Sequence, residues 1–142
     1  MAVAVTEDVP TCLALRRAVF TLEQGVSVAD EVDGRDGEAV HLLARRDGVP
    51  VGTARILIAE GTGKIGRVCV LAGERGKGIG AALVRAAVAH LRGVPGVRRA
   101  KLGAQVHATG FYAALGFAPT GPEYMDAGIP HRDMVLELDP GG

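Results

Sequence analysis

The stretch Arg75-Gly76-Lys77-Gly78-Ile79-Gly80 lies where the sequence changes from one periodicity to another. Before it, Lys64–Leu71 is rich in β-branched residues and has the character of a strand. After it, apolar residues recur every four positions, at Ile79, Leu83, Ala87 and Leu91. This spacing predicts an amphipathic helix that ends at Arg92, where Gly93 can cap it. A glycine-rich loop therefore joins a strand to a helix.

The flanking sequence extends this unit into an α+β pattern. Further strands are expected at Ala2–Val5, Ala39–Arg46, Val51–Ala59, Arg98–His107, Phe117–Ala118 and His131–Leu138, and further helices at Asp8–Leu22 and Thr109–Leu115. Asp47-Gly48 is a strong hairpin signal, and Glu60–Gly63 is expected to form a second turn. The unit Lys64–His107 should bring two strands together in parallel. The fold class is α+β, with a mixed, mainly antiparallel central sheet flanked by helices, in a single domain spanning 1–142 with a frayed tail at Asp139–Gly142.

Composition excludes several classes of protein. Sixteen basic residues balance sixteen acidic ones, and the basic residues are dispersed, which argues against a nucleic-acid partner. No apolar run approaches the ~20 residues that span a bilayer, so no membrane association is expected. Two cysteines, Cys12 and Cys69, are too few for a disulfide framework or a four-ligand zinc site, and no metal is expected. These features favour a cytoplasmic protein.

The glycine loop is the strongest chemical signal. A helix N-terminus carries unpaired N–H donors and a partial positive charge, and glycines let a phosphate approach the backbone closely. Arg75 and Lys77 add positive charge, so a diphosphate ligand is expected. The order of residues fails the P-loop pattern. It fits G-x-G-x-x-A, but the residues from 98 to 122 contain no Asp or Glu to hold a ribose, which leaves NAD as a minor alternative.

The remaining diphosphate is that of coenzyme A. Arg75-x-x-Gly78-x-Gly80 resembles the pyrophosphate-binding signature of the GNAT superfamily of acyl-CoA-dependent N-acetyltransferases, and Phe111–Phe117 is similar to that family's F-Y-x-x-x-G-F segment. The element order is also similar from end to end. More narrowly, three segments resemble the ElaA/YjcF-like branch of the family: Phe20–Val26, His41–Ala44 and Gly128–His131.

The resemblance implies an N-acetyltransferase that moves an acetyl group from acetyl-CoA to a primary amine in a direct, ternary-complex attack. It also implies a splayed pair of parallel strands that holds the pantetheine arm. The residues implied in cofactor binding are Val68, Val70, Arg75, Gly76, Lys77, Gly78, Ile79 and Gly80. Tyr112 matches the family's general acid, which protonates the thiolate as it leaves.

The general base and the acceptor are less defined. His107, at the end of the second splayed strand, is the first candidate for the base, and Glu31, His41 and Glu123 are alternatives that would act through a water. The acceptor is a small-molecule or peptide amine, and a homodimer is left open. A non-catalytic acyl-CoA-binding or sensing domain on the same fold is the alternative function.

A run of acidic residues has two interpretations. Asp30, Glu31, Asp33, Asp36 and Glu38 fall within nine residues, relieved only by Arg35. They do not fit the spacing of an EF-hand. One interpretation is a solvated acidic loop. The other is that the run borders the acceptor site, where its charge would favour a cationic amine.

Overall fold

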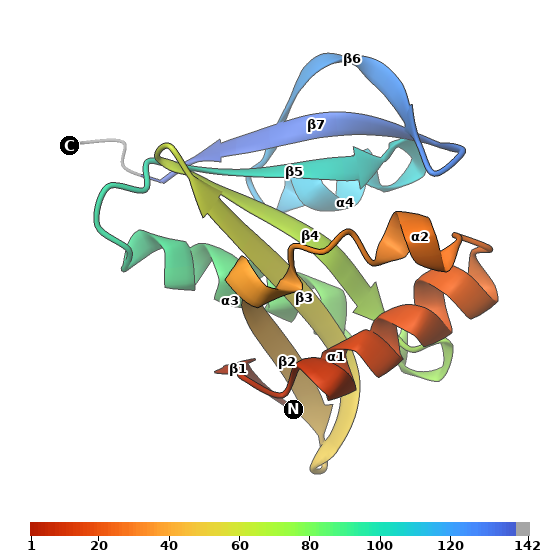
Figure 1. The fold of residues 1–142 in the computed structure, drawn as a ribbon. Coiled ribbons are helices and arrows are strands. Elements are labelled where there is room, and N and C mark those ends of the chain that lie inside the picture. The colour runs from red at the N-terminus through yellow and green to blue at the C-terminus, as the bar shows by residue number, and fades with distance from the viewer. Residues whose placement is uncertain (139–142) are drawn as a thin grey trace. The chain divides into compact units, whose positions relative to one another are not determined.

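The computed structural model describes residues 1–138, apart from the side chain of Asp30, so the expected tail at Asp139–Gly142 lies outside the described residues (Figure 1). Its strands are β1 (Ala2–Thr6), β2 (Val40–Arg46), β3 (Val49–Ala59), β4 (Thr62–Val70), β5 (Arg99–Gln105), β6 (Ala118–Asp126) and β7 (Ile129–Glu137). Its α-helices are α1 (Val9–Arg16), α2 (Val28–Glu31), α3 (Ile79–Arg92) and α4 (Thr109–Ala114). Short 3₁₀ turns occupy Asp36–Glu38, Ala72–Glu74 and Val106–Ala108. None of these helices is both long and apolar enough to cross a bilayer.

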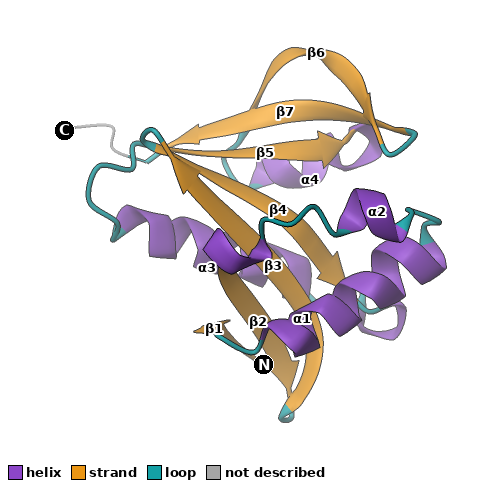
Figure 2. Cartoon of the chain, viewed as in Figure 1, coloured by secondary structure: helices purple, strands orange, loops and turns teal. Residues whose placement is uncertain are grey.

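The sheet confirms the predicted fold class. Its seven strands follow the order β1-β2-β3-β4-β5-β7-β6. β4 and β5 pair in parallel, from Thr62 opposite Arg99 to Lys64 opposite Lys101, while β1–β2, β2–β3, β5–β7 and β6–β7 pair antiparallel. The sheet is therefore mixed and mainly antiparallel, and helices flank it (Figure 2).

The chain divides into two compact units. The first contains Met1–Leu57 and Ile65–Ala87, and the second contains Ile58–Lys64 and the chain from Val88 onward. In the first unit, α1 starts where Asp8 caps it, with the Thr11 N–H donating to Asp8 Oδ1 over 3.2 Å. The apolar face of α1 packs into a core cluster of Cys12, Leu15, Val19, Leu43 and Cys69.

In the second unit, β5, β7 and β6 form an antiparallel layer with two different faces. Its buried face contributes Ala100, Leu102, Ala104 and Met134. Gly63 on β4 lacks a side chain because Leu91 of α3 lies directly over it. α4 runs alongside β5 in Figure 1.

Four boundaries differ from the sequence predictions. The helix expected over Asp8–Leu22 changes at Arg17 into a π-helix that runs to Glu23, with Gln24 N–H bonded to Val19 O over 3.0 Å. The turn expected over Glu60–Gly63 has only two residues, because Glu60 and Gly61 both have positive φ and close a tight hairpin.

The other two differences lie in the second unit. The brief strand expected at Phe117–Ala118 is the nine-residue β6, which tolerates two prolines because it is an edge strand with a register shift between Thr120 and Tyr124. The strand expected over Arg98–His107 ends at Gln105, since the chain turns into a 3₁₀ helix at Val106.

Candidate functional site

The glycine loop of the first unit leaves its backbone accessible. Gly76 and Gly78 have φ values of +80° and +79°, which favour glycine, and no atom lies within 4 Å of a Cβ built at either position. The Ala82 N–H donates to Gly78 O over 3.0 Å, so the first turn of α3 forms directly after the loop. The N–H groups that open a helix have no partner within it. The loop therefore has both the donors and the space that an anion requires.

The two cations of this loop are already paired with carboxylates. Arg75 binds both carboxylate oxygens of Glu23, at the end of the π-helix, and its Nε donates to Val70 O over 3.1 Å. Lys77 Nζ lies 3.0 Å from Glu74 Oε2. Hydrogen bonds from Arg46 and then Lys77 lower the pKa of Glu74 to about 2, so this carboxylate stays ionised at neutral pH. A phosphate bound at the loop would therefore lie near Arg75 and Lys77 while these are paired with Glu23 and Glu74.

Val68 and Val70 lie half-buried on β4, just before the loop. The residue before them, Arg67, has a φ of +49°, which is uncommon for a residue with a side chain and interrupts the regular strand. The Val70 carbonyl accepts the bond from Arg75. The sequence prediction that the backbone of these two valines pairs with a pantetheine arm stays a prediction.

Tyr112, the predicted acid, lies on α4 in the second unit. Its ring packs edge-on against Phe111 and Phe117, with centroids 5.0 Å and 6.4 Å away. Burial raises the pKa of the Tyr112 hydroxyl above its ordinary value of 10. The phenol therefore keeps its proton at neutral pH, as a proton donor must.

His107, the predicted base, does not end a strand but lies exposed in the 3₁₀ turn after β5. Its Nε2 is 2.7 Å from Oε1 of Gln105, the last residue of β5. Because that oxygen can only accept, Nε2 carries the proton and Nδ1 holds the lone pair. Glu123, an alternative base, is exposed on β6.

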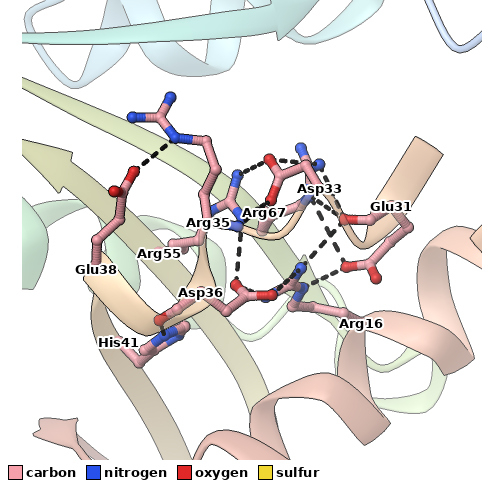
Figure 3. A network of polar contacts seen from close by, with 9 residues as sticks. All are labelled: Arg16, Glu31, Asp33, Arg35, Asp36, Glu38, His41, Arg55 and Arg67. Atoms are coloured by element: carbon pink, nitrogen blue, oxygen red, sulfur yellow. Dashed lines mark hydrogen bonds and ion pairs between the residues drawn. The ribbon is translucent and has the colours of Figure 1, made fainter. Parts of the chain in front are cut away.

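The other two alternatives, Glu31 and His41, belong to a buried network in the first unit (Figure 3). Glu31 is 4% exposed and is bound by Nε of Arg16, which is itself 1% exposed. His41 Nε2 lies 2.9 Å from Asp36 O, while its Nδ1 is buried with no partner among the described residues. Because Glu31 is buried and held by Arg16, the structure favours a structural role for it.

The same network gives a third account of the acidic run, different from both predictions. Asp36 accepts hydrogen bonds from Arg16 and Arg55, and Asp33 accepts from both Nη groups of Arg55 at 2.8 Å (Figure 3). Arg67 donates twice to the Glu31 carbonyl, over 3.1 and 3.0 Å. Glu31, Asp33 and Asp36 are thus neither freely solvated nor a concentration of unpaired charge.

The pKa values follow from this pairing. The hydrogen bonds from Arg55 hold the pKa of Asp33 far below its ordinary value. Burial would raise the pKa of Asp36, but its bonds to Arg16 and Arg55 outweigh burial and lower it. Because Arg16, Arg55 and Arg67 form ion pairs with Glu31, Asp33 and Asp36, the proposed attraction of a cationic acceptor by these carboxylates loses its basis.

Sequence reasoning missed the arginines and Glu23. Arg16, Arg55 and Arg67 carry the counter-charge of the acidic run, yet they lie 15 to 36 positions from the groups that they bind. The signal that was available is that Arg55 and Arg67 interrupt apolar strands, where an unpaired charge would be costly. Among the described residues, no cluster of three or more His, Cys, Asp or Glu side chains could hold a metal ion.

The chain is similar to known proteins both in sequence and in fold. Residues 14–138 match the model of the acetyltransferase (GNAT) domain family. The chain is 32% identical to the uncharacterized N-acetyltransferase YjcF of Bacillus subtilis (strain 168), over 92% of this chain and 94% of YjcF. The crystal structure of Escherichia coli ElaA has a TM-score of 0.86 at 32% identity, covering 96% of this chain and all of that one. An acyl-CoA N-acyltransferase from Pseudomonas aeruginosa has a TM-score of 0.85 at 31% identity, covering 95% of this chain and 98% of that one.

Proposed function

Because this chain belongs to the GNAT acetyltransferase family, we propose that it transfers the acetyl group of acetyl-CoA to a primary amine by direct attack in a ternary complex. The acceptor is a small molecule or a peptide. The observation that carries the proposal is the open glycine loop at the start of α3, because its conformation and space suit a diphosphate. Tyr112, which is half-buried and whose raised pKa keeps it protonated at neutral pH, supports the chemical half of the proposal.

Binding of the diphosphate rests mainly on the loop backbone. The residues proposed to contact acetyl-CoA are Arg75, Gly76, Lys77, Gly78, Ile79 and Gly80, with Val68 and Val70 supplying backbone groups to the pantetheine arm. Arg75 uses three of its five N–H donors on Glu23 and Val70, which leaves two for a phosphate oxygen. The backbone N–H groups of the loop need no such sharing.

Tyr112 is proposed as the general acid. When the amine nitrogen attacks the thioester carbon, the C–N bond forms and the C–S bond breaks, which leaves a thiolate. A phenol that stays protonated can transfer its proton to that sulfur. The sequence predicts His107 as the first candidate for the acceptor of the amine proton, and its Nδ1 lone pair is compatible with that prediction.

The experiment is a screen of amine acceptors with release of free coenzyme A as the readout. The panel contains spermidine, tyramine, glucosamine, kanamycin and a short peptide with a free N-terminus. A thiol reagent suits the assay because both cysteines are buried, and burial raises the pKa of Cys69 to about 12. We expect amine-dependent thiol release with at least one acceptor, and an acetylated product by mass spectrometry.

Two other outcomes would change the assignment. Binding of acetyl-CoA by calorimetry, without turnover of any amine, would favour the non-catalytic acyl-CoA-binding domain. Retention on an NAD resin but not on a coenzyme A resin would instead favour a nicotinamide enzyme.

A further inference from the structure

His131 lies near the start of β7 on the more polar face of the second unit's sheet. Its register partners are Gln105 on β5 and Tyr124 on β6. Residues that face each other across two strands project to the same side of a sheet. The Tyr124 ring stacks on the imidazole, with a centroid distance of 6.0 Å and an angle of 23° between the planes. The imidazole of His131 is half-buried, and the Tyr124 ring covers one of its faces.

The hydrogen bond of His131 fixes its tautomer. Nδ1 lies 2.7 Å from the carbonyl oxygen of Ile129. A carbonyl oxygen only accepts, so in the neutral ring Nδ1 carries the hydrogen and Nε2 carries the lone pair. Nε2 has no hydrogen-bond partner among the described residues. This is the arrangement that a general base needs: an oriented ring whose basic nitrogen is open.

The charged side chains near the His131 imidazole are paired with other groups. Asp133, two residues further along the same face, accepts a hydrogen bond from the Tyr124 hydroxyl over 2.6 Å and lies 3.4 Å from Lys101 Nζ on β5. Gly103 lies on β5 opposite Asp133, and the Tyr124 hydroxyl occupies the space that a Cβ would take there. The carboxylate therefore has its own partners and leaves Nε2 of His131 unengaged.

The proposed acid, Tyr112, and His131 would reach the reacting atoms from opposite faces of the layer formed by β5, β7 and β6. Met134 and Leu136 alternate with His131 and Asp133 along β7, so they project to the opposite face. A Cβ at Gly116, just after α4, would lie 3.4 Å from Leu136 Cδ1, which places the end of that helix on the opposite face too. β4 pairs with β5 only from Thr62 opposite Arg99 to Lys64 opposite Lys101, so the later part of β5 is not paired with β4. The sulfur and the nitrogen of a tetrahedral centre at that edge could therefore be reached from both faces.

We infer that His131 is the general base of the proposed acetyl transfer, an inference that rests on the proposed function. Nε2 of His131 takes a proton from the amine nitrogen as the C–N bond forms. The C–S bond breaks, and the thiolate takes the proton of Tyr112. Proton exchange with solvent then restores both residues. The products are the N-acetyl amine and coenzyme A, so atoms and charge balance. His131 differs from the exposed His107 in being half-buried and stacked.

The test compares His131→Asn with the parent chain, using acetyl-CoA and whichever amine of the panel turns over fastest. Asn can keep a donor near the Ile129 carbonyl but offers no basic nitrogen. We expect kcat to fall by about 10²–10⁴-fold with the affinity for acetyl-CoA unchanged in calorimetry. Added imidazole should restore part of the activity of His131→Ala.

The controls separate this inference from the proposed function. His90→Asn, at a histidine in the last turn of α3, is the matched control and should keep the parental rate. If the parent turns over an amine but His131→Asn keeps the parental rate, the inference is overturned while the proposed function stands. A loss confined to His107→Asn would overturn it in favour of His107. Absence of turnover in the parent would overturn both.

Discussion

Glu23 and Arg75, 52 residues apart in sequence, form a two-pronged ion pair beside the glycine loop, with Oε2 of Glu23 2.8 Å from Nη2 of Arg75. Both side chains are more than a third exposed, at 38% and 45%. Exposed ion pairs are worth only ~0–1 kcal/mol because solvent screens them. The pair therefore orients the Arg75 side chain but contributes little to the stability of the fold. We conclude that the loop backbone, rather than this side chain, supplies most of the proposed affinity for the diphosphate.

Gly78→Glu tests the role of the backbone. A carboxylate at this position would repel a diphosphate and occupy the open space beside the loop, and we expect a loss of at least ~2 kcal/mol in acetyl-CoA affinity by calorimetry. Gly48→Glu is the matched control, because Gly48 has nearly the same φ, +78° against +79°, and is equally open. Equal affinities in the two variants would remove the loop from the site.

Tyr112→Phe should separate binding from chemistry. The substitution keeps the ring that packs between Phe111 and Phe117 and removes only the hydroxyl. Turnover should fall ~10²–10⁴-fold, while the affinity for acetyl-CoA barely changes. Since burial raises the pKa of this phenol, activity of the parent should show no loss from its ionisation below about pH 10. A rate within twofold of the parent, with chemistry rate-limiting, would exclude Tyr112 as the acid.

Arg16→Met should destabilise the first unit strongly. Arg16 is 1% exposed and binds Glu31, which is 4% exposed, so its loss leaves a buried carboxylate without this partner, while Asp36 keeps its bond to Arg55. Breaking a buried pair from one side typically costs about 3–5 kcal/mol. Arg35→Met is the control, since Arg35 and Glu38 are 53% and 57% exposed and should contribute ~0–1 kcal/mol. Urea denaturation measures both, and similar midpoints would contradict the structural role of the network.

The network also predicts how stability depends on acid. The pKa values of Asp33 and Asp36 are lowered in the folded chain, from an ordinary value of 3.8. Their contribution is therefore complete above about pH 4 and is lost as the pH falls below it, because the unfolded chain then binds protons more readily. Unfolding free energies at pH 7 and pH 3 give the difference. It should be smaller in Asp33→Asn, and an equal difference in both chains would contradict this assignment.

The sequence alone determined the features that depend on neighbours along the chain. Asp47-Gly48 supplies two residues of positive φ, so its hairpin forms as predicted. The four-residue repeat from Ile79 to Leu91 and the cap at Asp8 likewise fix where α3 and α1 begin. These signals act within a turn or two of the chain, and they sufficed for the order of the elements and for the glycine loop.

Only the tertiary structure decided the features that join distant residues. Arg16 reaches Glu31, and Arg55 reaches Asp33, across 15 and 22 positions, and these contacts turn an acidic run into a neutral network. The placement of the His131 ring likewise depends on the stacking of Tyr124 and on the pairing of β7 with its neighbours. Charge and proton affinity depend on what lies within a few ångströms in space. That distance is set by the packing of strands and helices, which spacing along the chain does not specify.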